Sequence, residues 1–97
     1  MSNPNTDEIF MEGLKEEFME TMVTNLTQMA ALIKKNKFEA IARIAHDIKG
    51  TAGIFGFDEG TEIAKQLQFA AKDEELEKTR ELIDRLKEYM KKNGLDI

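Results

Sequence analysis

The chain contains almost no residue that would interrupt a helix, and its apolar residues recur at helical spacing nearly throughout. Its only proline is Pro4, and it has 6 glycines in 97 residues. So few turn-forming residues favour helices over turn-rich β structure. A chain of this length forms one domain with one modest core. We therefore expect a single all-α domain over residues 1–97, with a bundle core from about residue 10 to residue 92.

The spacing predicts four long amphipathic helices joined by short loops, with one short helix before them. Such helices form an up-and-down antiparallel four-helix bundle, here with a short additional N-terminal helix. The expected helices are, in order, Thr6 to Met11, Leu14 to Lys35, Phe38 to Phe55, one that begins at Asp58, and one that begins at Asp73 and carries Leu76 to Met90. The apolar stripes of these helices are expected to take up most of the six methionines and six phenylalanines as core residues.

Capping signals mark the ends of the expected helices. Gly56 is placed to end the expected helix Phe38 to Phe55, and Asn93-Gly94 is placed to end the last expected helix. Asp58 and Asp73 are placed to cap, through their side chains, the two expected helices that they begin.

Composition excludes several classes of function. The chain has no cysteine and one histidine, so thiol chemistry and multi-histidine metal sites are excluded, and we expect no metal site. Its net charge of −5 argues against nucleic acid as the main partner. No apolar run approaches the roughly 20 residues of a membrane span. We expect a soluble, cytoplasmic protein without a membrane partner.

The most informative segment surrounds the sole histidine, His46. At about 100° per residue, His46 lies nearly opposite the apolar stripe of its helix. Lys49, Gly50 and Gly53 fall within about 60° of it, and Arg43 joins them one turn earlier. An exposed histidine alone indicates little, and the two cations could simply be a solvated face. The combination of histidine, cations and glycines is what points to function.

The two glycines would destabilise a helix by about 2 kcal/mol together. They could mark an early helix end or a close helix contact. Alternatively, they clear the surface around His46 so that the active site of a large partner can reach the imidazole. Histidine can act as a nucleophile and carry a covalent group. If that group is a phosphoryl group, Lys49 can stabilise its charge.

The charge around His46 has the opposite sign to that of the whole chain. Residues 34 to 49 carry a net charge of +3. A local basic surface on an acidic protein indicates an acidic partner site.

The sequence Ala45-His46-Asp47-Ile48-Lys49-Gly50-Thr51-Ala52-Gly53 resembles the signature of the histidine-containing phosphotransfer (HPt) domain family of two-component phosphorelays. The resemblance implies that His46 is phosphorylated on its outer ring nitrogen, near Lys49, and that Gly50 and Gly53 admit a receiver domain. It implies partners of two kinds: a response regulator receiver domain, and a sensor or hybrid histidine kinase. It also implies a phosphocarrier and not an enzyme, with no nucleotide site and no cofactor of its own, the magnesium ion belonging to the receiver.

The resemblance carries over one further residue, Gln68, which lies 22 positions after the histidine. In many family members a polar residue there hydrogen-bonds the inner ring nitrogen and so orients the imidazole. The alternative is that Gln68 is an ordinary surface residue of its helix.

Three alternatives to a stand-alone phosphocarrier stay open. The chain could be the phosphotransfer domain of a chemotaxis-type histidine kinase, which it resembles at His46 to Phe57, although those domains usually have glutamate at the position of Gln68. It could be a non-catalytic helical module that only binds receivers. A helical-bundle enzyme or metal carrier has few residues from which to build a site. Because no apolar stripe is plainly left over, we expect a monomer.

Overall fold

The computed structural model describes the backbone of residues 4–97 and the side chains of residues 7–97. The described residues form four α-helices and one short 3₁₀ turn. These are α1 (Pro4–Lys34), α2 (Phe38–Ala52), η1 (Gly53–Phe55), α3 (Asp58–Lys72) and α4 (Leu76–Lys92). The expected all-α bundle is confirmed for this part of the chain.

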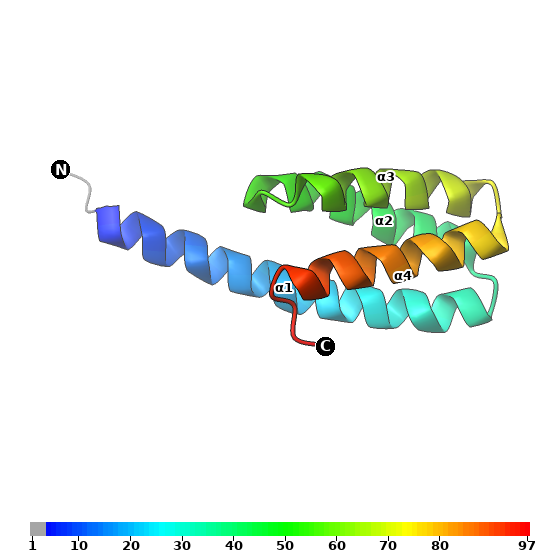
Figure 1. Ribbon diagram of the computed structural model, residues 1–97, viewed down its shortest axis with the longest axis horizontal. Coiled ribbons are helices and arrows are strands. Elements are labelled where there is room, and N and C mark those ends of the chain that lie inside the picture. The colour runs from blue at the N-terminus through cyan, green and yellow to red at the C-terminus, as the bar shows by residue number, and fades with distance from the viewer. Residues whose placement is uncertain (1–3) are drawn as a thin grey trace.

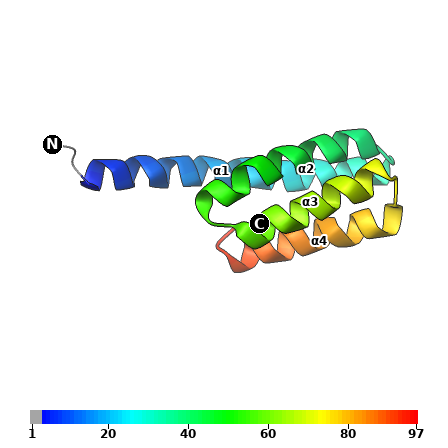
Figure 2. The ribbon, with the colours of Figure 1, turned by 90° about the horizontal axis from the view of Figure 1, so that it is seen from above.

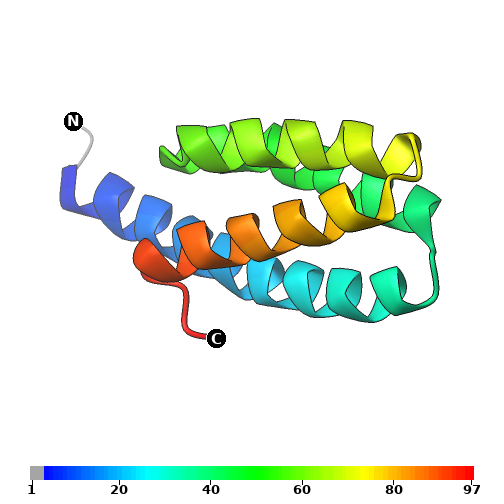
Figure 3. The same cartoon turned by 45° about the vertical axis from the view of Figure 1, so that its right-hand side comes forward.

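The helices alternate in direction, and each packs against its neighbours in the chain (Figures 1 and 3). α1 also packs against α4, which closes the bundle. Buried aliphatic side chains fill the space between the helices, among them Met29 of α1, Ile41 of α2, Leu67 of α3 and Leu86 of α4. Only two polar residues with described side chains are buried, Gln68 and Thr79. The Thr79 hydroxyl donates to the Glu75 carbonyl, so its burial is satisfied.

The prediction of a separate N-terminal helix is wrong, because Thr6 to Met11 and the following stretch form one helix, α1. Gly13 lies within it, and an interior glycine destabilises a helix by only about 1 kcal/mol relative to alanine. With no proline nearby, this cost does not interrupt the helix. The 31 residues of α1 span about 46 Å, against about 22 to 26 Å for the other helices.

The N-terminal part of α1 therefore projects beyond the end of the bundle (Figures 1 and 2). Every described side chain from residue 7 to residue 17 is exposed. The packed bundle begins near Phe18, later than the expected residue 10. As a result, not all the phenylalanines and methionines belong to the core: Phe10 and Met11 are exposed, and so is Phe69 on α3.

The second helix ends earlier than predicted, at Ala52. The chain tightens into η1 over Gly53–Phe55, and Gly56 then takes a left-handed conformation with φ 84°. The Gly56 amide donates to the Gly53 carbonyl, and the Phe57 amide donates to the Ala52 carbonyl. Gly56 thus ends the segment as predicted, but Gly53 lies at a helix junction. Gly50 is consequently the one glycine inside α2, so only one residue there destabilises the helix relative to alanine.

The predictions of aspartate caps are wrong for both helices. Phe57 and Glu75 occupy the N-cap positions of α3 and α4, and neither makes a side-chain cap hydrogen bond. Asp58 is the first residue of α3, where its charge favours the helix dipole. Asp73 instead follows the last residue of α3. The predicted end of α4 is confirmed, since Asn93 follows its last residue and Gly94 has φ 101°.

Aromatic rings close the end of the bundle from which α1 projects. Phe18 stacks against Phe55 and Phe57, with centroid distances of 5.0 and 5.7 Å. Tyr89 of α4 meets the edge of Phe57 at 6.4 Å and an interplanar angle of 90°. Lys15 places its ammonium 5.4 Å from the Phe57 centroid. This cluster fixes the point at which α1 leaves the bundle.

None of the helices in the described part of the chain combines the length and apolar character that a membrane span requires.

Candidate functional site

His46 lies in the middle of α2 and points away from the core. Ala45, one residue before His46, and Ile48, two residues after it, are almost completely buried, whereas His46 is exposed. The 3.6-residue period of the helix produces this separation. The structure thus gives the imidazole access to solvent and to a partner.

Gln68 reaches His46 from the neighbouring helix α3. Its side-chain nitrogen lies 3.4 Å from the Nδ1 atom of His46. Gln68 itself is only 8% exposed, so it is not a surface residue of α3. With Nδ1 facing this buried amide, Nε2 is the ring nitrogen left for chemistry.

A shallow groove runs beside the imidazole between α2 and α3. Arg43, His46, Gln68 and Lys72 line it, over a floor that includes Ala42. Two carboxylates, Glu39 and Glu74, also line it. Within the part of the chain whose side chains are described, neither Arg43 nor Lys72 has a carboxylate within 4.0 Å. These cations are therefore available to an anionic group.

The remaining predicted residues continue along α2 on the other side of His46. Lys49 is partly buried one turn later, and Gly50 is exposed. A Cβ added to Gly50 would meet no atom within 4 Å. Gly53, two turns from His46, is exposed in η1, and a Cβ there would lie 3.4 Å from the Thr61 hydroxyl of α3. The structure thus brings an exposed imidazole, cations and a low surface together on one face.

One neighbour of the site, Lys72, and one exposed aromatic residue of α3, Phe69, were not predicted from the sequence. Lys72 lies one helical turn after Gln68, so the same spacing could have revealed it once Gln68 was placed. Phe69 follows Gln68 and leaves 55% of its surface exposed. The general assignment of the phenylalanines mainly to the core included Phe69, and its exposure in α3 corrects that assignment.

The described side chains were also compared with the ligand sets that hold metal ions in proteins. In the described residues, no group of three or more histidine, cysteine, aspartate or glutamate side chains is arranged to hold a metal ion.

Comparison with known proteins identifies the family. A family model described as the Hpt domain matches residues 13–92. No curated protein and no solved structure matched the chain. Since the family model covers most of the chain, the protein belongs to the Hpt domain family, whose members are histidine phosphotransfer modules of phosphorelays. The match confirms the family that the residues around His46 resemble.

Proposed function

We propose that this protein accepts a phosphoryl group on Nε2 of His46 and relays it between a sensor or hybrid kinase, or a receiver aspartate, and a response regulator. The observation that carries the proposal is the pairing of an exposed imidazole with a buried amide, Gln68, at 3.4 Å. Such a contact fixes the orientation of the ring without covering its reactive edge. The chain then acts as a phosphocarrier with no nucleotide site or cofactor of its own, and magnesium is supplied by the receiver.

The contact with Gln68 has a consequence for the tautomer. For Nε2 to attack phosphorus it must hold a lone pair, so the proton of neutral imidazole must be on Nδ1. Nδ1–H then donates, and it needs an acceptor. The amide nitrogen of Gln68 faces Nδ1 here, and a rotation of the amide by 180° would present its oxygen instead. Gln68 can therefore serve the nucleophilic tautomer from the same position, as a positioning residue.

The variant Gln68→Leu is expected to slow phosphotransfer to His46 about three- to tenfold, the equivalent of one lost hydrogen bond. Gln68→Glu should retain the rate, because a carboxylate also accepts from Nδ1–H. Nitrogen-15 chemical shifts of the imidazole would report the tautomer in each variant. Gln66→Leu is the matched control, since Gln66 contacts Glu62 on the same helix and not His46. Unchanged shifts and rate in Gln68→Leu would show that the amide does not position the ring.

The charges at this face support an acidic partner surface. A phosphoryl group on Nε2 would be approached by Lys49 on α2 and by the groove cations Arg43 and Lys72. The same cations suit the aspartate cluster of a receiver domain. Gly50 and Gly53 keep the surface low.

Two alternatives make different predictions. As the phosphotransfer domain of a chemotaxis-type kinase, the chain would take phosphate from that kinase's own catalytic domain and not from a receiver. As a module that only binds, it would hold receivers without ever becoming labelled. Gln68 and the intact combination of His46, Lys49 and Gly50 favour the phosphocarrier.

The test is a transfer profile against phosphorylated receiver domains. We expect label to move from at least one receiver to this chain and to be stable in base and labile in acid, as a phosphoramidate is. A receiver that binds tightly while no label is transferred would support the binding module instead. Label that arrives only from a chemotaxis-type kinase catalytic domain would support the second alternative.

A further inference from the structure

The projecting part of α1 carries apolar side chains that nothing in the described chain covers. We call residues 7–17 the α1 overhang. Phe10 is 65% exposed, Met11 46% and Leu14 36%. At 100° per residue these three side chains fall within an arc of about 100° that also includes Phe18, the residue stacked at the end of the bundle. The overhang thus extends the apolar stripe of α1 beyond its last partner in the chain.

Gly13 is a second feature of the overhang that a monomer does not explain. It is exposed inside a helix, where glycine is unfavourable relative to alanine. A Cβ added there would meet no atom within 4 Å, so no contact among the described residues requires a glycine. On the helical wheel Gly13 lies beside Phe10, at one edge of the apolar stripe. A missing side chain at that edge leaves room for a group from another molecule.

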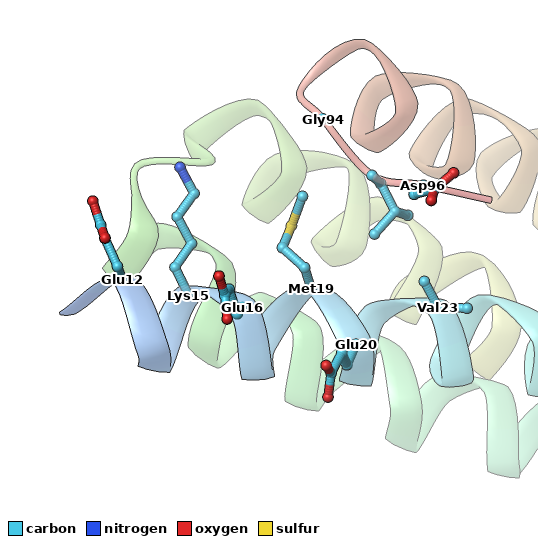
Figure 4. Close-up of a pocket in the computed structure, with 9 residues that line it drawn as sticks. Glu12, Lys15, Glu16, Met19, Glu20, Val23, Gly94 and Asp96 are labelled. Carbon is cyan, nitrogen blue, oxygen red and sulfur yellow. The ribbon is translucent and has the colours of Figure 1, made fainter. Parts of the chain in front are cut away.

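The charged side chains of the overhang lie around the stripe and, at one position, within it. Lys15 and Glu8 lie along its other edge, and Glu12 and Glu16 lie on the opposite side of the helix. Asp7 falls within the stripe, and Glu17 falls beside Phe10. Figure 4 shows the Lys15 side chain rising from α1 at the end of the bundle. Its ammonium has no carboxylate within 4.0 Å among the described side chains. The edge of the stripe opposite Gly13 thus carries one cation and one anion, and two of the five acidic residues of the overhang face away from the stripe.

We propose that a second copy of this chain covers the stripe, with the two overhangs packed antiparallel about a two-fold axis between Met11 and Glu12. This register puts Phe10 of each copy level with Gly13 of the other, where the absent side chain makes room for the ring. It also puts Lys15 level with Glu8 of the other copy, on the edge that antiparallel helices bring together. Both contacts occur twice, as an isologous interface requires.

The proposal differs from the monomer expected from the sequence, because that expectation placed Met11 and Leu14 in separate helices. One continuous α1 instead aligns their side chains and leaves a stripe uncovered. The interface is small, so the dimer forms and dissociates with concentration. His46 faces outward from the middle of α2 and lies outside the interface. The dimer therefore does not depend on the proposed function, and either can fail without the other.

Sedimentation equilibrium of the full chain over a series of concentrations tests the proposal. We expect reversible dimerisation of the unaltered protein and loss of the dimer in Phe10→Ser. Phe69→Ser is the matched control, because Phe69 is similarly exposed but lies on α3, and it should dimerise normally. Helical circular dichroism should be the same in all three, since both side chains are exposed. A protein that stays monomeric into the upper micromolar range, or a dimer that survives Phe10→Ser, would overturn the proposal.

Charge reversal tests the antiparallel register. Glu8→Lys or Lys15→Glu alone should weaken dimerisation about tenfold, because each turns two attractive pairs into two repulsive ones. The double variant restores opposite charges at both pairs and should recover the original affinity. Failure of the double variant to recover affinity would rule out this register. A thermal unfolding curve would first establish that Lys15→Glu still folds without the contact between the Lys15 ammonium and the Phe57 ring.

Discussion

The variant His46→Gln is expected to carry no label after incubation with any phosphorylated receiver or kinase that labels the unaltered chain. A glutamine amide has no nucleophilic nitrogen, and the chain has no second histidine to substitute for it. Because His46 is exposed, the thermal unfolding midpoint should barely change. The measurement is transfer of radiolabelled phosphate, with the unfolding curve as the control for folding.

The opposite result for this variant would be informative. If His46→Gln accepted acid-labile phosphate at the original rate, the nucleophile would be another side chain. The proposal that His46 carries the phosphoryl group would then be wrong. If the variant bound receivers as tightly as before and only transfer was lost, docking and chemistry would be separable. That second result is the one we expect, since the cations and glycines of the face stay in place.

The variant Gly50→Leu is expected to separate stability from function. Gly50 is exposed inside α2 with open space around it, so leucine fits and, as a better helix former, should stabilise the fold by about 0.5 to 1 kcal/mol. The new side chain rises one turn from His46, where a receiver has to approach. Displacement of the receiver's aspartate from the imidazole should slow transfer about a hundredfold.

The matched control is Gly13→Leu, which makes the same change at another exposed helical glycine. A Cβ at Gly13 also meets no atom, but that residue lies in the α1 overhang, away from His46. It should raise helix stability similarly and leave transfer unaffected. Normal transfer in Gly50→Leu would mean that partners do not approach over this part of α2, and the argument from glycines would fail.

The sequence predicted the fold class and the exposure of His46 because both depend on local periodicity. The positions of Ile41, Ala45 and Ile48 define the buried side of α2, and His46 is exposed as a direct result. The contact with Gln68 followed from a family resemblance, since spacing within one helix cannot show which residue of another helix meets the imidazole.

The errors concern features that depend on competition between weak local preferences. The gap between Met11 and Leu14 contains one glycine, whose cost is too small to end a helix flanked by good helix formers. The caps were misassigned for two different reasons. Asp58 lies inside the first turn of α3, where aspartate is favoured as it is at the cap. Asp73 follows the last residue of α3, and α4 begins later, at Leu76. The exposure of Phe69 depends on how α3 rotates against its neighbours, which composition does not reveal.

The edge-on contact between Tyr89 and Phe57 gives the protein a native optical reporter. The chain has no tryptophan and only one tyrosine, so its intrinsic fluorescence comes almost entirely from Tyr89. That ring sits against Phe57, which also stacks on Phe18 where α1 leaves the bundle. Changes in the packing of this end would alter the emission of a single fluorophore. Unfolding and association could therefore be followed in the unlabelled chain.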